Sequence, residues 1–249
     1  MGQIIILGSG YAVPEEGHDN THLFIQQGDL GILVDCATNP VVQMRKAGLD
    51  LDRINDLILT HFHPDHVSGV PLLLMDLWLL GRKKPLHIYG LPHTIERAET
   101  MMKLYDWKKW PNFFPVTYNR LPEQEMSVII SRPDLKIYSS PVKHIIPTIG
   151  LRVEFIPEDK SVAYSCDTEP CQQVVRLAAK ADILIHEATG ASLGHSSPAQ
   201  AAMIARQADA RQLILIHYSA RKAAETLESA EEVFDGPIKL AEDFMKLDF

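Results

Sequence analysis

Thr60-His61-Phe62-His63-Pro64-Asp65-His66-Val67-Ser68 is the stretch that decides the fold, because it places three imidazoles and one carboxylate within six residues. The apolar run at 54–59 predicts a buried strand before it, and we expect a helix after it. Strands hold such a loop rigid while its side chains face a crevice. We interpret the spacing as a split ligand set, with His61 and His63 on one metal ion and Asp65 and His66 on a second. Four unconnected surface or core side chains are the less favoured alternative.

Two metal ions need more ligands, which we expect at the ends of other strands. His144 follows the strand-like run 136–142, Asp167 follows 161–166 and His217 follows 212–216. A carboxylate has two oxygens and can bridge two cations, so we predict that both ions share Asp167. The predicted metal ligands are His61, His63, Asp65, His66, His144, Asp167 and His217.

Further motifs lie downstream, at Leu184–Thr189, Gly194–Ala202 and His217–Ser219. Together with the His61–His66 motif they resemble the metallo-β-lactamase superfamily and, within it, the ribonuclease Z-like phosphodiesterase branch. The resemblance runs from Ile4 to the C-terminus. It implies an α/β (α+β) fold, the metallo-β-lactamase αββα sandwich, in which two mixed sheets pack face to face with helices outside. We expect residues 1–249 to form a single metal-dependent hydrolase domain.

The resemblance also implies a chemistry. Two divalent cations, zinc in the first place and manganese or iron otherwise, hold a bridging hydroxide that attacks a small or nucleotide-like phosphodiester. Asp65 orients the hydroxide, and His195 protonates the leaving group while Glu187 holds its imidazole. His186 and Glu187 are neighbours in a strand and point to opposite faces, so only one serves the site. We choose Glu187 and expect His186 in the core or on the sheet face.

A buried acceptor is expected behind the ligand loop, because metal ligands need groups that orient them. Asp35 directly follows the apolar strand predicted at 31–34 and fits this role. Cys166 stands where the ribonuclease Z-like branch commonly has glycine before the shared aspartate, and we expect it to crowd the pocket slightly.

The charge of the chain weighs on the choice of substrate. A net charge of −8 and a pI near 5.7 argue against a surface built to grip polyanions. Only residues 145–166 separate His144 from Asp167, whereas ribonuclease Z proteins that mature transfer RNA carry a long basic arm there. RNA is therefore disfavoured as a partner. The alternatives are transfer-RNA 3′ processing, hydrolysis of carboxylic esters, lactones or aryl sulfates, and a non-catalytic metal-stabilised binding protein.

The remaining composition bears on compartment and assembly. The three cysteines form no Cys-x-x-Cys pair and no even disulfide framework, which favours reduced thiols in the cytoplasm. The N-terminal apolar run is too short for a signal peptide, and the apolar stretch 72–80 is interrupted by Asp76 and too short to span a bilayer. We expect no membrane partner, and the resemblance implies a homodimer.

Each of three further features has two possible interpretations. Arg82-Lys83-Lys84 is a solvated turn or a phosphate-binding patch, and we favour the turn. The aromatic cluster Tyr105–Phe114 stacks on a substrate or packs against the core or a second subunit, and packing is favoured. His18, Asn20 and His22 rim a pocket or lie unpaired on the surface, and we favour the surface.

The remaining pattern predicts local elements. The runs 21–26 and 31–34 indicate a hairpin around Gln27-Gly28-Asp29, and Asn39 is expected to cap a helix that ends at Gly48. The alternation from Gly150 to Ile156 predicts a half-exposed antiparallel strand.

Overall fold

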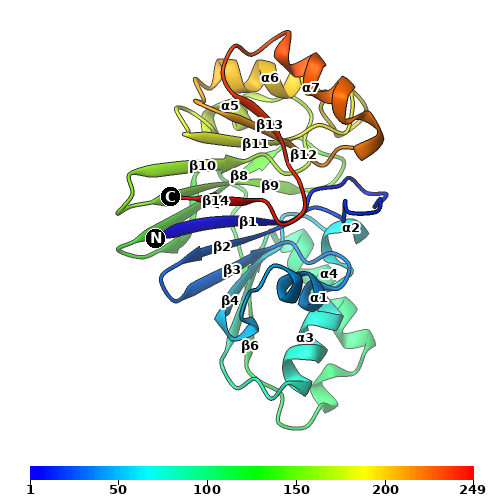
Figure 1. Ribbon diagram of the computed structural model, residues 1–249. Helices are drawn as coiled ribbons and strands as arrows, with labels where there is room; N and C mark the ends of the chain where they lie inside the picture. Colours follow the sequence, from blue (N-terminus) through cyan, green and yellow to red (C-terminus); the bar gives the residue numbers. More distant parts are fainter.

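The computed structural model describes residues 1–249 and consists of two seven-stranded sheets packed face to face (Figure 1). The first sheet contains, in spatial order, β14 (Lys246–Asp248), β1 (Gly2–Gly8), β2 (His22–Gln27), β3 (Leu30–Val34), β4 (Ile54–Ile58), β5 (Leu86–Gly90) and β6 (Val116–Arg120). The second contains β13 (Ile238–Leu240), β12 (Leu213–Ile216), β11 (Ile183–Glu187), β10 (Lys160–Tyr164), β9 (Thr148–Phe155), β8 (Leu135–Val142) and β7 (Ser127–Ser131). Each sheet mixes parallel and antiparallel pairs, as predicted.

Helices cover the outer face of each sheet (Figure 1). The first sheet is covered by α1 (Pro40–Lys46), α3 (Val70–Leu79) and α4 (Pro92–Leu104), and the second by α5 (Gln172–Leu177), α6 (Pro198–Gln207) and α7 (Ala223–Glu231). The short helix α2 (Pro64–Val67) lies within the histidine-rich loop, and three single-turn helices are η1 (Leu51–Arg53), η2 (Trp107–Lys109) and η3 (Ala220–Lys222). The predicted αββα sandwich is therefore confirmed. No helix is both long enough and apolar enough to cross a membrane.

Strand periodicity explains why the layers form. Successive side chains of a strand point to opposite faces, so a continuous apolar run can bury both faces. In β1, Ile4 and Ile6 pack between the sheets, whereas Ile5 and Leu7 pack under the helices. In β9 the face opposite the inter-sheet core carries partly exposed Arg152 and Glu154, which confirms the predicted half-exposed antiparallel strand.

One edge of the sandwich gathers the loops that follow the strands. β3 to β6 run parallel to one another, and so do β10 to β13. The carboxyl ends of parallel strands meet at one edge, and the turn from β8 to β9 reaches the end of β10 there. This is the edge at which α2 lies, on the right of Figure 1. The direction and pairing of the strands therefore already place the predicted ligands at one edge of the sandwich.

Several local predictions are confirmed. β2 and β3 form the expected hairpin, and the side chain of Asn39 accepts a hydrogen bond from the backbone N–H of Val42 at the start of α1. The prediction for Arg82 was wrong, because this residue is only 5% exposed. Its guanidinium donates to the backbone carbonyls of Ile54, Lys84 and Pro85, so it joins β4 to the turn before β5 and is not available to a phosphate.

The aromatic cluster packs, as favoured. Trp110 stacks on Trp78 of α3 with ring centroids 5.0 Å apart, and Phe113 stacks on Phe114 at 4.4 Å. Phe114 is buried in the core beneath the helices of the first sheet, and Trp110 and Phe113 pack against that core. These contacts account for Trp110, Phe113 and Phe114 without a substrate, whereas Tyr105 is 57% exposed.

Candidate metal centre

All seven predicted ligands come together at the strand-end edge, in two groups. His61 follows β4, His63 lies in the same loop, and His144 lies in the turn from β8 to β9. The Nε2 atoms of His61 and His144 each lie 3.1 Å from the Nδ1 atom of His63. Three imidazole nitrogens therefore converge on one point, although the chain separates His63 from His144 by 81 positions.

The second group contains Asp65, His66, Asp167 and His217. The Oδ2 atom of Asp65 lies 3.5 Å from His66 Nε2 and 3.6 Å from His217 Nε2. The Oδ2 atom of Asp167 lies at the same two distances from these nitrogens and 3.9 Å from His61 Nε2 of the first group. Asp167 is thus the carboxylate that touches both groups.

The outer nitrogens of two histidines in the second group are tied to fixed acceptors. His66 Nδ1 lies 2.8 Å from Asp35 Oδ2, so it donates to this carboxylate. His217 Nδ1 lies 2.7 Å from Thr189 Oγ1, which already donates its own hydrogen to the His217 carbonyl and must therefore accept. In the neutral rings that bind a metal, the Nε2 atoms would therefore carry the lone pairs, and both Nε2 atoms are buried without a hydrogen-bond partner.

In the first group, too, the Nδ1 atoms of two histidines are hydrogen-bonded to fixed acceptors. Thr60 Oγ1 donates to Asp35, 2.7 Å away, and so accepts from His61 Nδ1 at 3.1 Å. His144 Nδ1 donates to the carbonyl of Gly194 at 2.7 Å. In both rings the Nε2 lone pair faces inward. Four inward lone pairs among carboxylates repel one another in the absence of positive charge, so this donor set fits divalent cations.

The electrostatics of the site agree with this assignment. Burial, aided by the neighbouring His66 imidazole, holds the pKa of His61 well below its ordinary value, so the ring is neutral as a metal ligand must be. Burial opposes the charge of Asp167, but positive charge on the His217 and His66 rings outweighs it and holds the pKa of this carboxyl well below its usual range. A divalent cation would supply that charge in their place once both rings are neutral. The predicted role of Asp35 is also confirmed, since its buried carboxylate accepts from both Thr60 and His66.

Thr189→Val is expected to lower metal affinity by about 10- to 100-fold, the usual cost of losing a group that orients a ligand. Valine keeps the shape of threonine but cannot accept from His217 Nδ1, so this ring can turn or change tautomer. Competition with a chelator measures the affinity. Thr100→Val, on the exposed side of α4, is the matched control and should change nothing. Equal affinities in the two variants would contradict the orienting role.

Glu187 and His195 form a second unit beside the ligands. Glu187 is buried at the end of β11, and its Oε1 accepts from His195 Nδ1 at 3.1 Å and from the backbone N–H of Ser196 at 2.9 Å. Its Oε2 accepts from the N–H of Thr189. The His195 ring lies 5.1 Å from that of His144, and because Nδ1 bonds Glu187, Nε2 is the nitrogen left for a substrate. Burial lowers the pKa of His195, but the bond to Glu187 outweighs it and raises the pKa, which favours the protonated acid.

His186 and Glu187 are neighbours in β11, and the structure places His186 in the core, as predicted. His186 is fully buried, and its Nδ1 bonds the carbonyl of Glu187 at 2.8 Å. It lies on the opposite face of β11 from Glu187, away from the ligands.

Several site residues leave their strands in a left-handed conformation. Asp35, Cys166 and His217 have φ values of 61°, 54° and 56°. Such a conformation costs roughly 1–3 kcal/mol in a residue other than glycine. It explains why glycine suits position 166, and here a buried cysteine occupies that position, with Sγ 3.6 Å from His61 Nδ1.

The prediction for His18, Asn20 and His22 was wrong, because all three are buried. His18 Nε2 lies 3.2 Å from the hydroxyl of Tyr218, next to the ligand His217, and Asn20 donates to the carbonyl of Tyr11. Single polar residues in a loop gave no sign of Tyr218, which comes from the far end of the chain. These contacts fix the loop at 9–20 against the metal centre.

The strand-end edge of this αββα sandwich carries a donor set that fits divalent cations, next to a histidine held by a buried carboxylate. Such a site can activate water, and the class that it defines is that of the metal-dependent hydrolases. The chain belongs to the beta-lactamase superfamily, since the family model described as Beta-lactamase superfamily domain matches residues 31–218.

Similar proteins support the same assignment. Ribonuclease Z of Methanothermobacter thermautotrophicus is 28% identical over 306 aligned positions, which cover 100% of this chain and 97% of that protein. The structure of human tRNase Z, short form, has a TM-score of 0.81 at 25% identity and covers 99% of this chain and 98% of that one. The metallo-beta-lactamase fold protein YhfI from Bacillus subtilis, with a TM-score of 0.82 at 20% identity and coverage of 99% and 98%, shows the same fold. The predicted superfamily and its ribonuclease Z-like branch are confirmed.

Proposed function

We propose that this hydrolase is a phosphodiesterase that uses two divalent cations to cleave a small or nucleotide-like phosphodiester, with residues 1–249 as one catalytic domain. The proposal rests on four imidazoles. Their Nδ1 atoms are hydrogen-bonded to protein acceptors, and their Nε2 atoms converge with two aspartates. We assign His61, His63 and His144 to one cation, Asp65, His66 and His217 to the other, and Asp167 to both.

Zinc is the ion we propose for both positions. Five imidazoles and two carboxylates are the ligand types that zinc prefers, while manganese and iron share some of this preference. When bound, the cations would lower the pKa of a water toward neutral pH and would supply positive charge beside a phosphoryl oxygen.

The residues of the chain do the rest of the chemistry. Asp65 is 16% exposed and faces the inner nitrogens of His66 and His217, so its carboxylate is placed to orient an attacking water and to accept its proton. His195 donates a proton to the leaving alkoxide. Glu187 keeps the imidazole charged and correctly turned, because its own position is fixed by backbone N–H groups.

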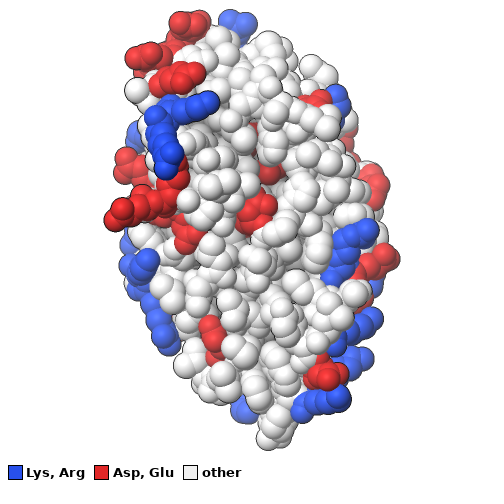
Figure 2. Space-filling view, turned by 90° about the vertical axis from the view of Figure 1, so that its right-hand side faces the viewer, with Lys and Arg blue, Asp and Glu red and all other residues white.

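A small substrate is supported by what joins β9 to β10. The segment between His144 and Asp167 is a plain hairpin of these two strands. The alignment with the archaeal ribonuclease Z has 306 positions and the chain 249 residues, so at least 57 positions of that alignment have no counterpart here. Figure 2, which views the edge on the right of Figure 1, shows a mostly uncharged centre with Lys and Arg toward the margins.

Transfer-RNA 3′ processing is the second candidate, because the relatives at 25% and 28% identity bear the names tRNase Z and ribonuclease Z. Hydrolysis of carboxylic esters, lactones or aryl sulfates uses the same metal core and is the third. A non-catalytic binding protein is not supported, since the class is that of the hydrolases.

The proposal also covers the cellular compartment and the oligomeric state. Three free cysteines suit a reducing compartment, so we propose the cytoplasm. A homodimer is supported by apolar side chains at helix ends, where Leu79 is 66% exposed and Leu104 is 80% exposed.

A substrate panel tests the proposed function. The zinc-loaded protein is expected to hydrolyse bis(p-nitrophenyl) phosphate and a dinucleoside phosphate, to lose this activity when a chelator removes the metal, and to regain it when zinc is restored. Precursor transfer RNA, an aryl ester and an aryl sulfate are the other substrates, each followed by initial rates. Faster turnover of the precursor RNA would favour the second candidate, and activity on esters or sulfates alone would favour the third.

A further inference from the structure

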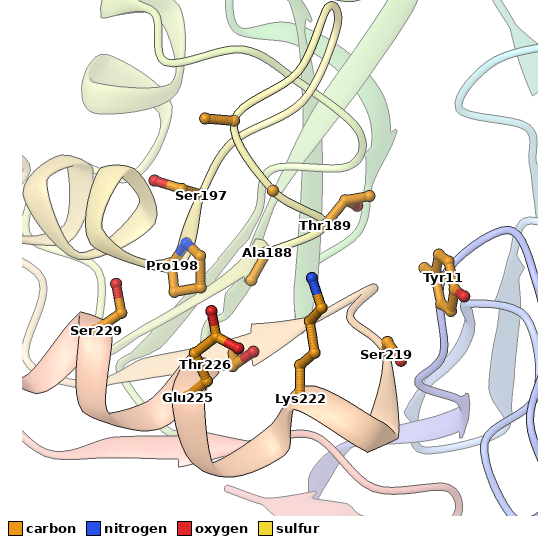
Figure 3. Close-up of a pocket in the computed structure, with 12 residues that line it drawn as sticks. Tyr11, Ala188, Thr189, Ser197, Pro198, Ser219, Lys222, Glu225, Thr226 and Ser229 are labelled. Carbon is orange, nitrogen blue, oxygen red and sulfur yellow. The ribbon is translucent and has the colours of Figure 1, made fainter.

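The loop between β11 and α6 carries His195, the proposed acid. Figure 3 shows this loop leaving Thr189, extending away from α7 and returning to Ser197 at the start of α6. The pocket drawn there lies on the α7 side of the loop and is lined by none of the proposed metal ligands. Residues 191–193 at the tip of the loop are exposed, so the core does not hold them. The position of His195 therefore depends on the hydrogen bonds that fix the loop on either side of it.

Two carboxylates hold the backbone on the two sides of His195. The N–H of Ser196, which follows it, donates to Glu187 Oε1 at 2.9 Å. The N–H of Gly194, which precedes it, donates to Glu169 Oε1 at 3.1 Å. Glu187 was predicted from the sequence, whereas Glu169 was not. The second carboxylate has the same relation to the backbone of the loop as the first.

Gly194 also contacts a proposed metal ligand directly. Its carbonyl accepts from His144 Nδ1 at 2.7 Å. Its φ of 83° lies in the left-handed region that favours glycine, and a Cβ at this position would lie 2.8 Å from the same Nδ1 atom. The backbone of the loop is therefore packed against the imidazole. One residue sets both the direction of the His144 hydrogen bond and the point at which His195 begins.

Glu169 is itself fixed to the turn that carries His144. Its backbone N–H donates to the carbonyl of Lys143 at 2.7 Å, and its Oε2 forms an ion pair with Lys143 Nζ. The Lys143 side chain is 65% exposed, and an ion pair with an exposed lysine contributes little to stability. The hydrogen bond to Gly194 is therefore the contact through which the Glu169 side chain can act on the site.

We propose that Glu169 is a positioning residue that joins the metal centre to its acid. By holding Gly194 it keeps the carbonyl in place for His144 Nδ1 and, one residue further on, keeps the His195 imidazole within reach of a leaving group. Without this carboxylate the N–H of Gly194 bonds water, and the loop and the His144 ring can turn. The role at His195 rests on the proposed phosphodiesterase function, whereas the role at His144 needs only the proposed metal site.

Four variants separate the hydrogen bond from the ion pair. Glu169→Ala and Glu169→Met remove both contacts, and methionine keeps the bulk of the side chain. Glu169→Gln keeps an oxygen for the N–H of Gly194 but loses the charge that faces Lys143. Lys143→Met removes the ion pair alone. Glu125→Ala is the matched control, because this partly exposed glutamate is paired with Arg176 at 2.7 Å and bonds none of the proposed ligands.

Three measurements follow the effect from Gly194 outward. In the metal-free protein, Glu169→Ala and Glu169→Met are expected to speed hydrogen exchange of the Gly194 amide about tenfold, the usual worth of one hydrogen bond. Zinc affinity, measured by competition with a chelator, should fall about tenfold, as expected for the loss of a group that orients a ligand. At saturating zinc, kcat should fall about tenfold more for a dinucleoside phosphate than for bis(p-nitrophenyl) phosphate, because only the alkoxide needs the proton of His195.

Glu169→Gln, Lys143→Met and Glu125→Ala should stay within about twofold of the wild type in all three measurements. Unchanged Gly194 exchange and zinc affinity in Glu169→Ala and Glu169→Met would overturn the inference. Equal losses in Glu169→Gln and Glu169→Ala would overturn it too, because the charge and not the hydrogen bond would then matter. A wild type that binds zinc but hydrolyses neither diester would refute the proposed function alone, since amide exchange and zinc affinity still decide what Glu169 does at His144.

Discussion

Asp167→Asn is expected to reduce hydrolysis of bis(p-nitrophenyl) phosphate by roughly a thousandfold or more, because the reaction depends on cations that acidify water. The side chain is 3% exposed, and its Oδ2 lies 3.5, 3.6 and 3.9 Å from the inner nitrogens of His66, His217 and His61. Asparagine has the same shape but no charge, so it cannot balance two cations. Metal analysis should find fewer than two zinc ions per chain, whereas we expect two in the wild type.

A matched variant separates this effect from a general loss of acidic charge. Asp159→Asn changes an exposed aspartate in the turn between β9 and β10, at a φ of 51° that asparagine tolerates. It should retain both metal content and activity. Circular dichroism of both variants checks that the sandwich is intact. An Asp167→Asn protein with two zinc ions and full activity would show that the shared-ligand assignment is wrong.

His195→Ala is expected to have an effect that depends on the leaving group. A dinucleoside phosphate releases an alkoxide that needs a proton, so kcat should fall about 10²- to 10⁴-fold. Bis(p-nitrophenyl) phosphate releases a stable phenolate, and its kcat should fall less than about tenfold. The geometry behind this prediction is the 3.1 Å bond from His195 Nδ1 to Glu187, which leaves Nε2 for the substrate. The ratio of the two kcat values is the measurement.

The control for His195 is another histidine with one fixed hydrogen bond. His87 lies on β5, with Nδ1 2.7 Å from Thr117 Oγ1, and His87→Ala should leave the ratio unchanged. Zinc content is measured for both variants. If His195→Ala slows both substrates equally and loses zinc, the residue acts as a ligand and not as an acid.

Much of the fold was predictable because it depends on local patterns. The alternation in β9, the hairpin from β2 to β3 and the cap at Asn39 each need only neighbouring residues, and each was confirmed. Strand β14 was not predicted, because the short run Lys246–Asp248 becomes a strand only by pairing with β1 at the other end of the chain. Its own residues carry too little information to indicate a partner.

Part of the candidate site was also predictable, for a topological reason. Each predicted ligand directly follows an apolar run or lies in the loop after one, and parallel strands bring such positions to one edge. The hydrogen-bond acceptors that orient the imidazoles were harder to predict. Thr60, Thr189 and the carbonyl of Gly194 fix three of the imidazoles, but a hydroxyl or a backbone oxygen has no distinctive spacing in a sequence.

The sequence by itself determined the ligand types, the strand-end positions that carry them and the layered fold, because these follow from side-chain chemistry and from the period of apolar residues. Only the tertiary structure decided which nitrogen of each imidazole faces inward, that Arg82 is buried under β4, and that His18 contacts Tyr218. It also decided that Glu169 holds Gly194, whose carbonyl in turn holds His144. These outcomes depend on groups that are far apart in the chain, and a hydrogen bond exists only when packing brings its donor and its acceptor together.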